Sequence, residues 1–194
     1  EPSEAAALEA TPTQVGVVEE LQSFYRQNAE FWEFFAPETH ENLDHVANAL
    51  ASLHNGNENG EGLRALFRAM HTIKGAAYSV GCKPIGAFAH QLEDLMVEVR
   101  EGRKPWSHEI AQLVLEGAQM LGQMLAVAEG KDPQAAQTLP RELFELQGRL
   151  AQLLGQEAPA PASTAAPLVS PTPARPARPT SSASVRVSLE RLDT

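Results

Sequence analysis

Apolar residues recur every three or four positions through most of this chain, and this spacing constrains its fold more than any other feature. The segments with this spacing are separated by short clusters rich in Gly, Pro and Asn, such as residues 55–60 and 102–105. A half-buried strand would alternate apolar and polar residues, and such runs are nearly absent. The sequence therefore predicts an all-α protein.

The breaks between periodic segments set the expected helices. Pro37 suits the first turn of a new helix, where a proline loses no hydrogen bond, and Ser107 is expected to cap another. The expected helices cover about 15–35, 37–53, 62–80, 84–101, 108–129 and 140–154. Helices of this length joined by short loops pack as antiparallel neighbours. We therefore expect an up-and-down, antiparallel four-helix bundle with additional flanking helices.

Composition divides the chain into four parts. Residues 1–14 are expected to form a disordered tail, and residues 15–155 a helical bundle whose core covers 35–130. Residues 156–184 are almost entirely Pro, Ala, Ser and Thr, which cannot offset the entropy of ordering, so we expect an extended linker. Residues 185–194 become apolar again and are expected to begin a further domain.

The charge distribution excludes several classes of partner. Residues 1–156 hold 22 of the 25 acidic and 11 of the 15 basic residues, a net charge of −11. An acidic body argues against nucleic acid, which requires clustered Lys and Arg. The single cysteine, Cys82, excludes an internal disulfide and suits a reducing cytoplasm, where we expect the protein to be located. No uninterrupted apolar run approaches the ~20 residues of a membrane span.

His71 lies inside one of the expected helices and is followed one turn later by Lys74 and Gly75. Glycine costs a helix roughly 1 kcal/mol relative to alanine, so a compensating purpose is expected. On a helical wheel of ~100° per residue, His71 falls on the shoulder of the buried stripe, with one ring edge free to face solvent. Lys74 falls close to the core, so its ammonium is expected to snorkel outward. Gly75 leaves bare backbone beside the imidazole, where a partner could approach closely.

The next expected helix carries His90 and Glu93, which are three residues apart and share a face. A carboxylate on this helix could hold one imidazole nitrogen of His71 as a hydrogen-bond donor and leave the other nitrogen nucleophilic. Glu93 is the candidate, with a solvated helix carboxylate as the alternative. His90 is equally compatible with an ordinary surface histidine.

The pattern His-x-x-Lys-Gly-x-x-x-x-x-Gly, over His71 to Gly81, resembles the phosphoacceptor helix of histidine phosphotransfer (HPt) domains. The longer sequence FRAMHTIKG, residues 67–75, is most similar to the N-terminal domain of CheA-like chemotaxis histidine kinases, and residues 90–93 match their His-x-x-Glu on the next helix. The resemblance implies that Nε2 of His71 takes a phosphoryl group, that Glu93 bonds Nδ1, and that Lys74 helps to neutralise the phosphoryl charge.

The same resemblance implies the partners. The phosphoryl group would come from ATP on the kinase domain of a parent protein histidine kinase, in the same chain or in a dimer partner. It would pass to an aspartate of a response-regulator receiver domain. No Gly-rich phosphate loop is visible, so this segment would hold no cofactor, would not be catalytic alone, and would leave ATP and Mg²⁺ to its partner domains. Residues 185–194 resemble the start of the parent's dimerisation domain.

Other functions remain open on the sequence alone. A stand-alone relay HPt protein would shuttle the phosphoryl group between two receivers by the same chemistry. A helical adaptor would leave His71 unphosphorylated. A metal site could combine His71, His90 and Glu93, but no His-x-x-x-His pair or cysteine cluster supports it, and no metal is expected. Cys82 has no evident base nearby in sequence.

Overall fold

The computed structural model describes residues 12–54 and 60–155, and these residues form six α-helices with short turns between them. The helices are α1 (Pro12–Gln27), α2 (Ala29–His54), α3 (Glu61–Val80), α4 (Lys83–Arg100), α5 (His108–Ala128) and α6 (Pro133–Leu154). The described residues contain no strand, so the predicted all-α class is confirmed. The predicted linker and dimerisation segment, and most of the N-terminal tail, lie outside the described residues.

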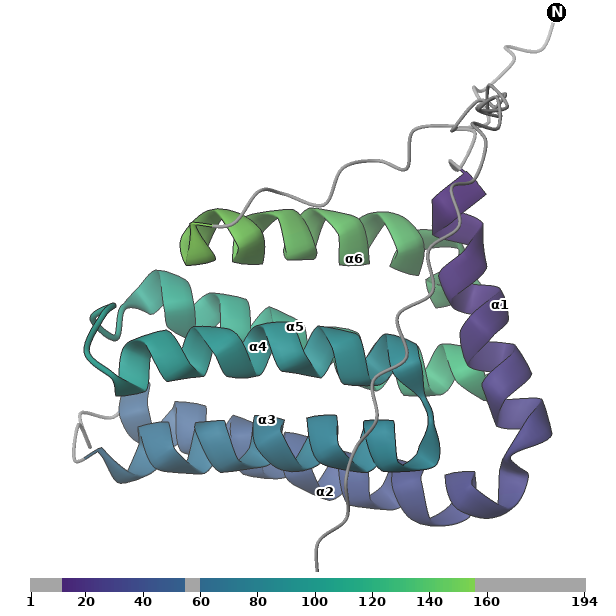
Figure 1. Ribbon diagram of the computed structural model, residues 1–194, viewed down its shortest axis with the longest axis horizontal. Helices are drawn as coiled ribbons and strands as arrows, with labels where there is room; N and C mark the ends of the chain where they lie inside the picture. The colour runs from purple at the N-terminus through teal and green to yellow at the C-terminus, as the bar shows by residue number, and fades with distance from the viewer. Residues whose placement is uncertain (1–11, 55–59, 156–194) are drawn as a thin grey trace, which may run out of the picture. The chain divides into compact units, whose positions relative to one another are not determined.

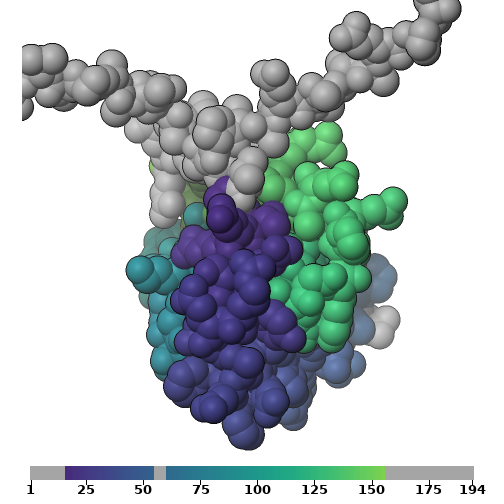
Figure 2. Space-filling model, turned by 90° about the vertical axis from the view of Figure 1, so that its right-hand side faces the viewer, coloured from purple at the N-terminus to yellow at the C-terminus, as the bar shows by residue number. Residues whose placement is uncertain are grey.

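Helices α2 to α5 form the four-helix bundle. In the bundle α2 packs against α3, α3 against α4, α4 against α5, and α5 against α2, which closes the ring. Helix α6 packs on α4 and α5 from outside. Helix α1 runs across one end of the bundle (Figure 1), and Figure 2 shows it covering that end. The additional flanking helices that the sequence predicts are therefore α1 and α6.

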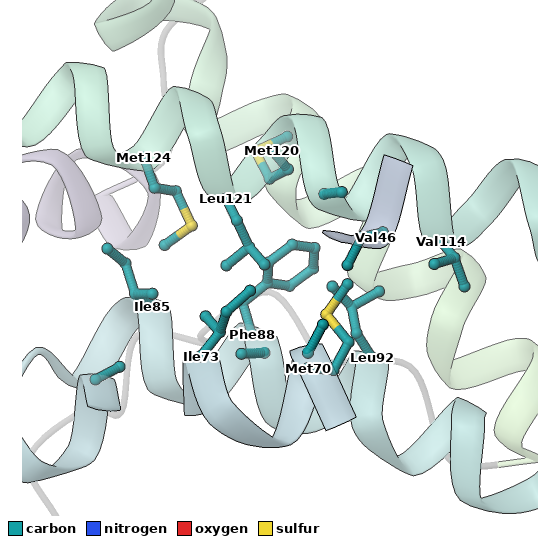
Figure 3. Close-up of a cluster of buried hydrophobic side chains, with 14 of the residues drawn as sticks. Val46, Met70, Ile73, Ile85, Phe88, Leu92, Val114, Met120, Leu121 and Met124 are labelled. Atoms are coloured by element: carbon teal, nitrogen blue, oxygen red, sulfur yellow. The ribbon is translucent and has the colours of Figure 1, made fainter. Parts of the chain in front are cut away.

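The centre of the bundle is a close-packed apolar core. Figure 3 shows the ring of Phe88, from α4, among side chains of the other three bundle helices. Its neighbours in that view include Val46 of α2, Ile73 of α3 and Leu121 of α5, and all four residues are at most 1% exposed. Each such side chain contributes roughly 1.5–3 kcal/mol when fully buried. The core thereby fixes how α3 and α4 face each other.

A two-residue turn joins α3 to α4. Gly81 has φ 87°, a left-handed conformation that suits glycine, and its N–H donates to the carbonyl of Tyr78. The N–H of Cys82 donates to the carbonyl of Ala77 at 2.8 Å, which completes the helix end. Beyond the turn, a Cβ on Gly86 would lie 3.0 Å from the Tyr78 ring, so the helices approach closely there. The predicted hairpin of these two helices is confirmed.

The predicted break at Pro37 is wrong. Helix α1 ends at Gln27, Asn28 separates it from α2, and Pro37 lies inside α2. The proline is tolerated because Pro37 and Glu33, whose carbonyl loses the hydrogen bond, are both on the exposed face of α2. The break falls at Asn28 because Trp32 folds back onto Phe24, with ring centroids 6.2 Å apart.

The predicted start of the last helix at Pro140 is also wrong. Helix α6 begins seven residues earlier, at Pro133, where the proline occupies the first turn. The side chain of Asp132 caps the helix by accepting from the N–H of Ala135 at 2.9 Å. Pro140 lies inside α6. The sequence Asp132-Pro133 is itself a helix-start signal, and it marks the true beginning of α6.

Helix α5 is the most apolar helix of the bundle. It is the one helix among the described residues that is long and apolar enough to cross a membrane by length and composition. The sequence contains no uninterrupted apolar run as long as a membrane span, as expected, but the average hydropathy of α5 reaches the level of one. Helix α5 packs against α1, α2, α4 and α6, which is the position of a core helix. Ser107 caps it as predicted, accepting from the N–H of Ile110 at 3.2 Å.

Candidate functional site

The side chains of His71 on α3 and Glu93 on α4 meet across the hairpin. Oε1 of Glu93 lies 2.8 Å from Nδ1 of His71, which is the contact that the family resemblance implies. The His71 side chain is 61% exposed, whereas that of Glu93 is 8% exposed. The alternative of a solvated helix carboxylate is therefore wrong for Glu93. The hairpin holds the imidazole by one nitrogen and leaves most of the ring open to solvent.

Lys74 binds the second oxygen of the same carboxylate. Its Nζ lies 2.5 Å from Oε2 of Glu93, and its side chain is only 22% exposed. The expectation that the ammonium snorkels outward is therefore wrong. Glu93 reaches the inner side of α3, so the ammonium finds a carboxylate partner there without leaving the bundle. One buried carboxylate thus joins two residues of the predicted site.

The charge of Glu93 determines which nitrogen of the His71 imidazole carries the hydrogen. Burial alone would raise the pKa of Glu93, but hydrogen bonds and positive charge from Lys74, together with the His71 contact, hold that pKa below its usual value. Glu93 is therefore ionised at neutral pH and can only accept hydrogen bonds. It follows that Nδ1 of His71 carries the hydrogen, and that Nε2 of the neutral ring has the free lone pair. Among the described residues no hydrogen bond to Nε2 is found.

The ring face of His71 contacts an aromatic side chain that sequence reasoning assigned only to the buried stripe. Phe67, one turn earlier on α3, stacks on the imidazole with ring centroids 5.9 Å apart and an interplanar angle of 23°. Arg100 of α4 places its guanidinium carbon 4.2 Å from the centroid of the Phe67 ring. A signal for Phe67 was its position four residues before His71. The sequence signal for Arg100 is weaker: this residue lies seven residues after Glu93, which places both on the same side of one helix.

Three residues of α4 that contact α3 are spaced seven residues apart, whereas their partners on α3 are seven and four residues apart. Gly86, Glu93 and Arg100 are seven residues apart on α4, and they face Tyr78, His71 and Phe67 of α3 respectively. Seven residues complete two helical turns, so these three positions lie on one side of α4. We call this row of contacts between α3 and α4 the seam, and the candidate site is its middle contact, between Glu93 and His71.

His90 does not join the site. Its Nε2 lies 3.5 Å from Oδ1 of Asp94, one turn later on α4, and its side chain is 53% exposed. The interpretation that His90 and Glu93 share a face is wrong in the folded helix, because Glu93 enters the seam while His90 is exposed. The structure thus brings together His71, Glu93 and Lys74 but places His90 apart from them.

Gly75 is exposed, one turn after His71. A Cβ built on this glycine would meet no atom within 4 Å, so the fold itself does not require glycine there. This contrasts with Gly117 of α5, where a Cβ would lie 2.5 Å from the Leu92 side chain. The reason for Gly75 must therefore be sought outside the bundle.

The competing chemistries lack a site in the described part of the chain. No group of three or more His, Cys, Asp or Glu side chains gathers there as metal ligands. Cys82 is fully buried, and burial raises the pKa of its thiol to about 12, which removes the thiolate that a nucleophile needs.

Known proteins share both this fold and these sequence features. The family model described as Hpt domain matches residues 30–156. The chain therefore belongs to the Hpt domain family, the histidine-containing phosphotransfer domains. The matched residues do not include α1.

Individual relatives point to one branch of that family. The chemotaxis protein CheA of Rhizobium meliloti is 32% identical over 148 residues, which cover 72% of this chain and 20% of that protein. The chemotaxis protein CheA of Salmonella typhimurium is 31% identical over 109 residues, 56% of this chain and 16% of that protein. This chain thus spans a fifth or less of the length of these curated relatives.

A solved structure supports the same likeness. The phosphorylated P1 domain of CheA3 from R. sphaeroides, determined in complex with CheY6, matches with a TM-score of 0.51 and 28% identity, covering 63% of this chain and 97% of that one. The chain is therefore a phosphotransfer domain similar to the P1 domain of CheA.

Proposed function

We propose that Nε2 of His71 is the phosphoacceptor of this domain, with ATP on the kinase domain of a chemotaxis-type histidine kinase as the donor. The observation that carries the proposal is the 2.8 Å contact between Glu93 and Nδ1 of His71, on an imidazole whose side chain is 61% exposed. This contact fixes the hydrogen on Nδ1 and leaves the Nε2 lone pair available for attack. The ATP and Mg²⁺ belong to the partner domain, and a cytoplasmic location suits their supply.

In the first step the Nε2 lone pair attacks the γ-phosphorus of ATP. The Nε2–P bond forms as the bond to the bridging oxygen breaks, and ADP leaves. The ring then carries substituents on both nitrogens and a formal positive charge, which the carboxylate of Glu93 offsets at Nδ1. Lys74 keeps Glu93 ionised, and its own charge helps to neutralise the incoming phosphoryl group.

In the second step a receiver domain takes the phosphoryl group. A carboxylate oxygen of the receiver's aspartate attacks the phosphorus, the Nε2–P bond breaks, and the imidazole returns to its neutral form with the hydrogen still on Nδ1. The likeness to a CheA3 domain determined with CheY6 supports a receiver as the acceptor. Gly75 provides the clearance for both partners, since the bundle itself leaves the space above it empty.

The test is incubation of this chain with the parent's ATP-binding domain and γ-labelled ATP. Wild-type chain should take up acid-labile, base-stable label, as expected for a phosphohistidine, and His71→Gln should take up none. His90→Gln is the matched control, because His90 is also an exposed histidine of the hairpin but bonds Asp94 instead of Glu93. Equal labelling of wild type and His71→Gln would overturn the proposal.

A further inference from the structure

The hydrogen bond from Nδ1 to Glu93 fixes only one point of the His71 ring. An imidazole held by one nitrogen can still rock about that bond, and the exposure of the side chain shows how little else surrounds it. In-line attack on phosphorus requires the Nε2 lone pair to keep its direction, and small misplacements of reacting atoms are costly in rate. A second contact on the ring is therefore needed.

Phe67 makes that second contact. Its ring lies on the face of the imidazole at a centroid distance of 5.9 Å and 23° from parallel, within the range of offset stacking. Phe67 and His71 are four residues apart on α3, so the backbone already places them one above the other. The stack opposes rocking of the imidazole, while the hydrogen bond to Glu93 opposes its sliding.

Phe67 is itself only partly buried, and Arg100 holds it from the other helix. The guanidinium carbon lies 4.2 Å from the ring centroid, the geometry of a cation–π contact. Arg100 stands seven residues after Glu93 on the same side of α4. Helix α4 therefore acts on the imidazole twice, directly through Glu93 and indirectly through Arg100 and Phe67.

We propose that Phe67 and Arg100 are positioning residues for the phosphoacceptor, with Phe67 fixing the plane of the His71 ring and Arg100 acting only through Phe67. This inference rests on the proposed function of His71. It assigns Arg100 no contact with the phosphoryl group or with a partner, which separates it from a charge-neutralising or docking role.

The test measures kcat and KM for phosphorylation of the chain by the parent's ATP-binding domain. Phe67→Leu keeps an apolar side chain of similar size but removes the ring, and Arg100→Gln removes the cation. We expect kcat to fall about fivefold for Phe67→Leu and about threefold for Arg100→Gln, with KM unchanged. The conservative variants Phe67→Tyr and Arg100→Lys should each retain most of the wild-type kcat. Arg141→Gln, an exposed arginine of α6, is the control and should leave both constants unchanged.

The double variant gives the sharpest distinction. Because Arg100 is expected to act only through Phe67, Phe67→Leu combined with Arg100→Gln should be no slower than Phe67→Leu alone. A further threefold loss in the double variant would show that Arg100 acts directly on the reaction, and a raised KM would show docking. Either result would overturn the proposal.

NMR provides a readout that does not depend on catalysis. The ring current of Phe67 should shift the NMR signals of the carbon-bound protons of the His71 imidazole. Arg100→Gln should move these signals towards their positions in Phe67→Leu. Circular dichroism and the unfolding midpoint check that the bundle of each variant is intact. Unchanged imidazole signals in Arg100→Gln would also count against the proposal. An unlabelled wild-type chain would refute the proposed function, whereas a labelled wild type with equally fast variants would refute this inference alone.

Discussion

Glu93 is the buried partner of an exposed histidine, and one 2.8 Å hydrogen bond joins its Oε1 to Nδ1 of His71. The carboxylate belongs to the packed interior, while the imidazole belongs to the surface. The bundle can therefore orient the reactive ring from inside without covering the nitrogen that reacts. The same carboxylate also carries the Lys74 ion pair, so changes at Glu93 affect both stability and reactivity.

Replacing Glu93 by glutamine should slow phosphorylation while keeping the fold. The amide oxygen should turn towards the Lys74 ammonium, which places the NH₂ group against Nδ1 of His71. The imidazole must then accept at Nδ1 and carry its hydrogen on Nε2, which removes the nucleophilic lone pair. We expect phosphorylation to fall by about 10- to 100-fold, the scale of a lost orienting or acid–base group. Glu93→Ala should also slow phosphorylation.

Glu98→Gln is the control for this substitution, since Glu98 is on the same helix but pairs with Arg103. The measurement is the initial rate of labelling from γ-labelled ATP. Wild-type rates in Glu93→Gln would contradict the assigned role.

Acid should remove the stabilisation provided by the Glu93 carboxylate. Although burial alone would raise the pKa of Glu93, Lys74 and His71 lower it below its usual value of about 4.5. A lowered pKa in the folded state means that the stabilisation is fully present above the unfolded-state pKa and is lost as pH falls through the folded-state pKa. The difference in unfolding free energy between wild type and Glu93→Gln should be present at neutral pH and shrink as the pH falls below about 4.5.

Urea unfolding followed by circular dichroism measures this difference. Glu129→Gln should show the same direction of change, because burial would raise the pKa of Glu129 but Lys131 and Trp32 lower it. A difference that grows on acidification would refute the sign of the effect at Glu93.

Alanine at position 75 should stabilise the bundle and impair its function. The new Cβ meets no atom within 4 Å, and alanine is favoured over glycine in a helix by about 1 kcal/mol. The thermal midpoint should therefore rise, while transfer of the phosphoryl group to a receiver should slow because the methyl group occupies the partner's space.

Gly148→Ala on α6 is matched to this variant, since a Cβ there also meets nothing within 4 Å. It should raise the thermal midpoint similarly and leave the transfer rate unchanged. If Gly75→Ala transferred the phosphoryl group to a receiver as fast as wild type, Gly75 would not be needed as space for the partner.

The Cys82 thiol should resist alkylation in the folded protein. With its pKa raised to about 12 by burial, very little thiolate is present at pH 8, about a thousandfold less than at the ordinary value of 9.0. Iodoacetamide at pH 8 should label the native chain at a small fraction of the rate in 8 M urea, as followed by intact mass. Comparable rates in both conditions would show that the end of the bundle covered by α1 opens readily.

The contact between His71 and Glu93 is implied by the resemblance to CheA-like phosphotransfer domains, and the predicted hairpin of their two helices allows it. The sequence did not anticipate that Lys74 remains inside, since that depends on how deeply Glu93 enters the seam. The sequence predicts helix starts near Pro37 and Pro140, because a proline signals a boundary unless its missing hydrogen bond can be tolerated in the folded helix. That tolerance depends on packing and solvent exposure, which a linear pattern does not contain.

The Phe67–Arg100 contact was missed for a different reason. An apolar residue on a buried stripe and a basic residue at a helix end each have an ordinary explanation, Arg100 being favourable near the negative end of the α4 dipole. Only the packing of α3 against α4 in the folded protein shows that Phe67 and Arg100 are in contact beside His71.

The seven-residue spacing of Gly86, Glu93 and Arg100 on α4 limits how the length of this hairpin can change. One residue inserted between Gly86 and Glu93 would turn the carboxylate by about 100° and carry it about 1.5 Å along the axis, away from His71. Seven residues added to each helix on the turn side of the site would leave the facing nearly unchanged. A hairpin of this kind can therefore grow or shrink in matched steps of two turns and keep its phosphoacceptor, but single insertions disconnect the histidine from its acid.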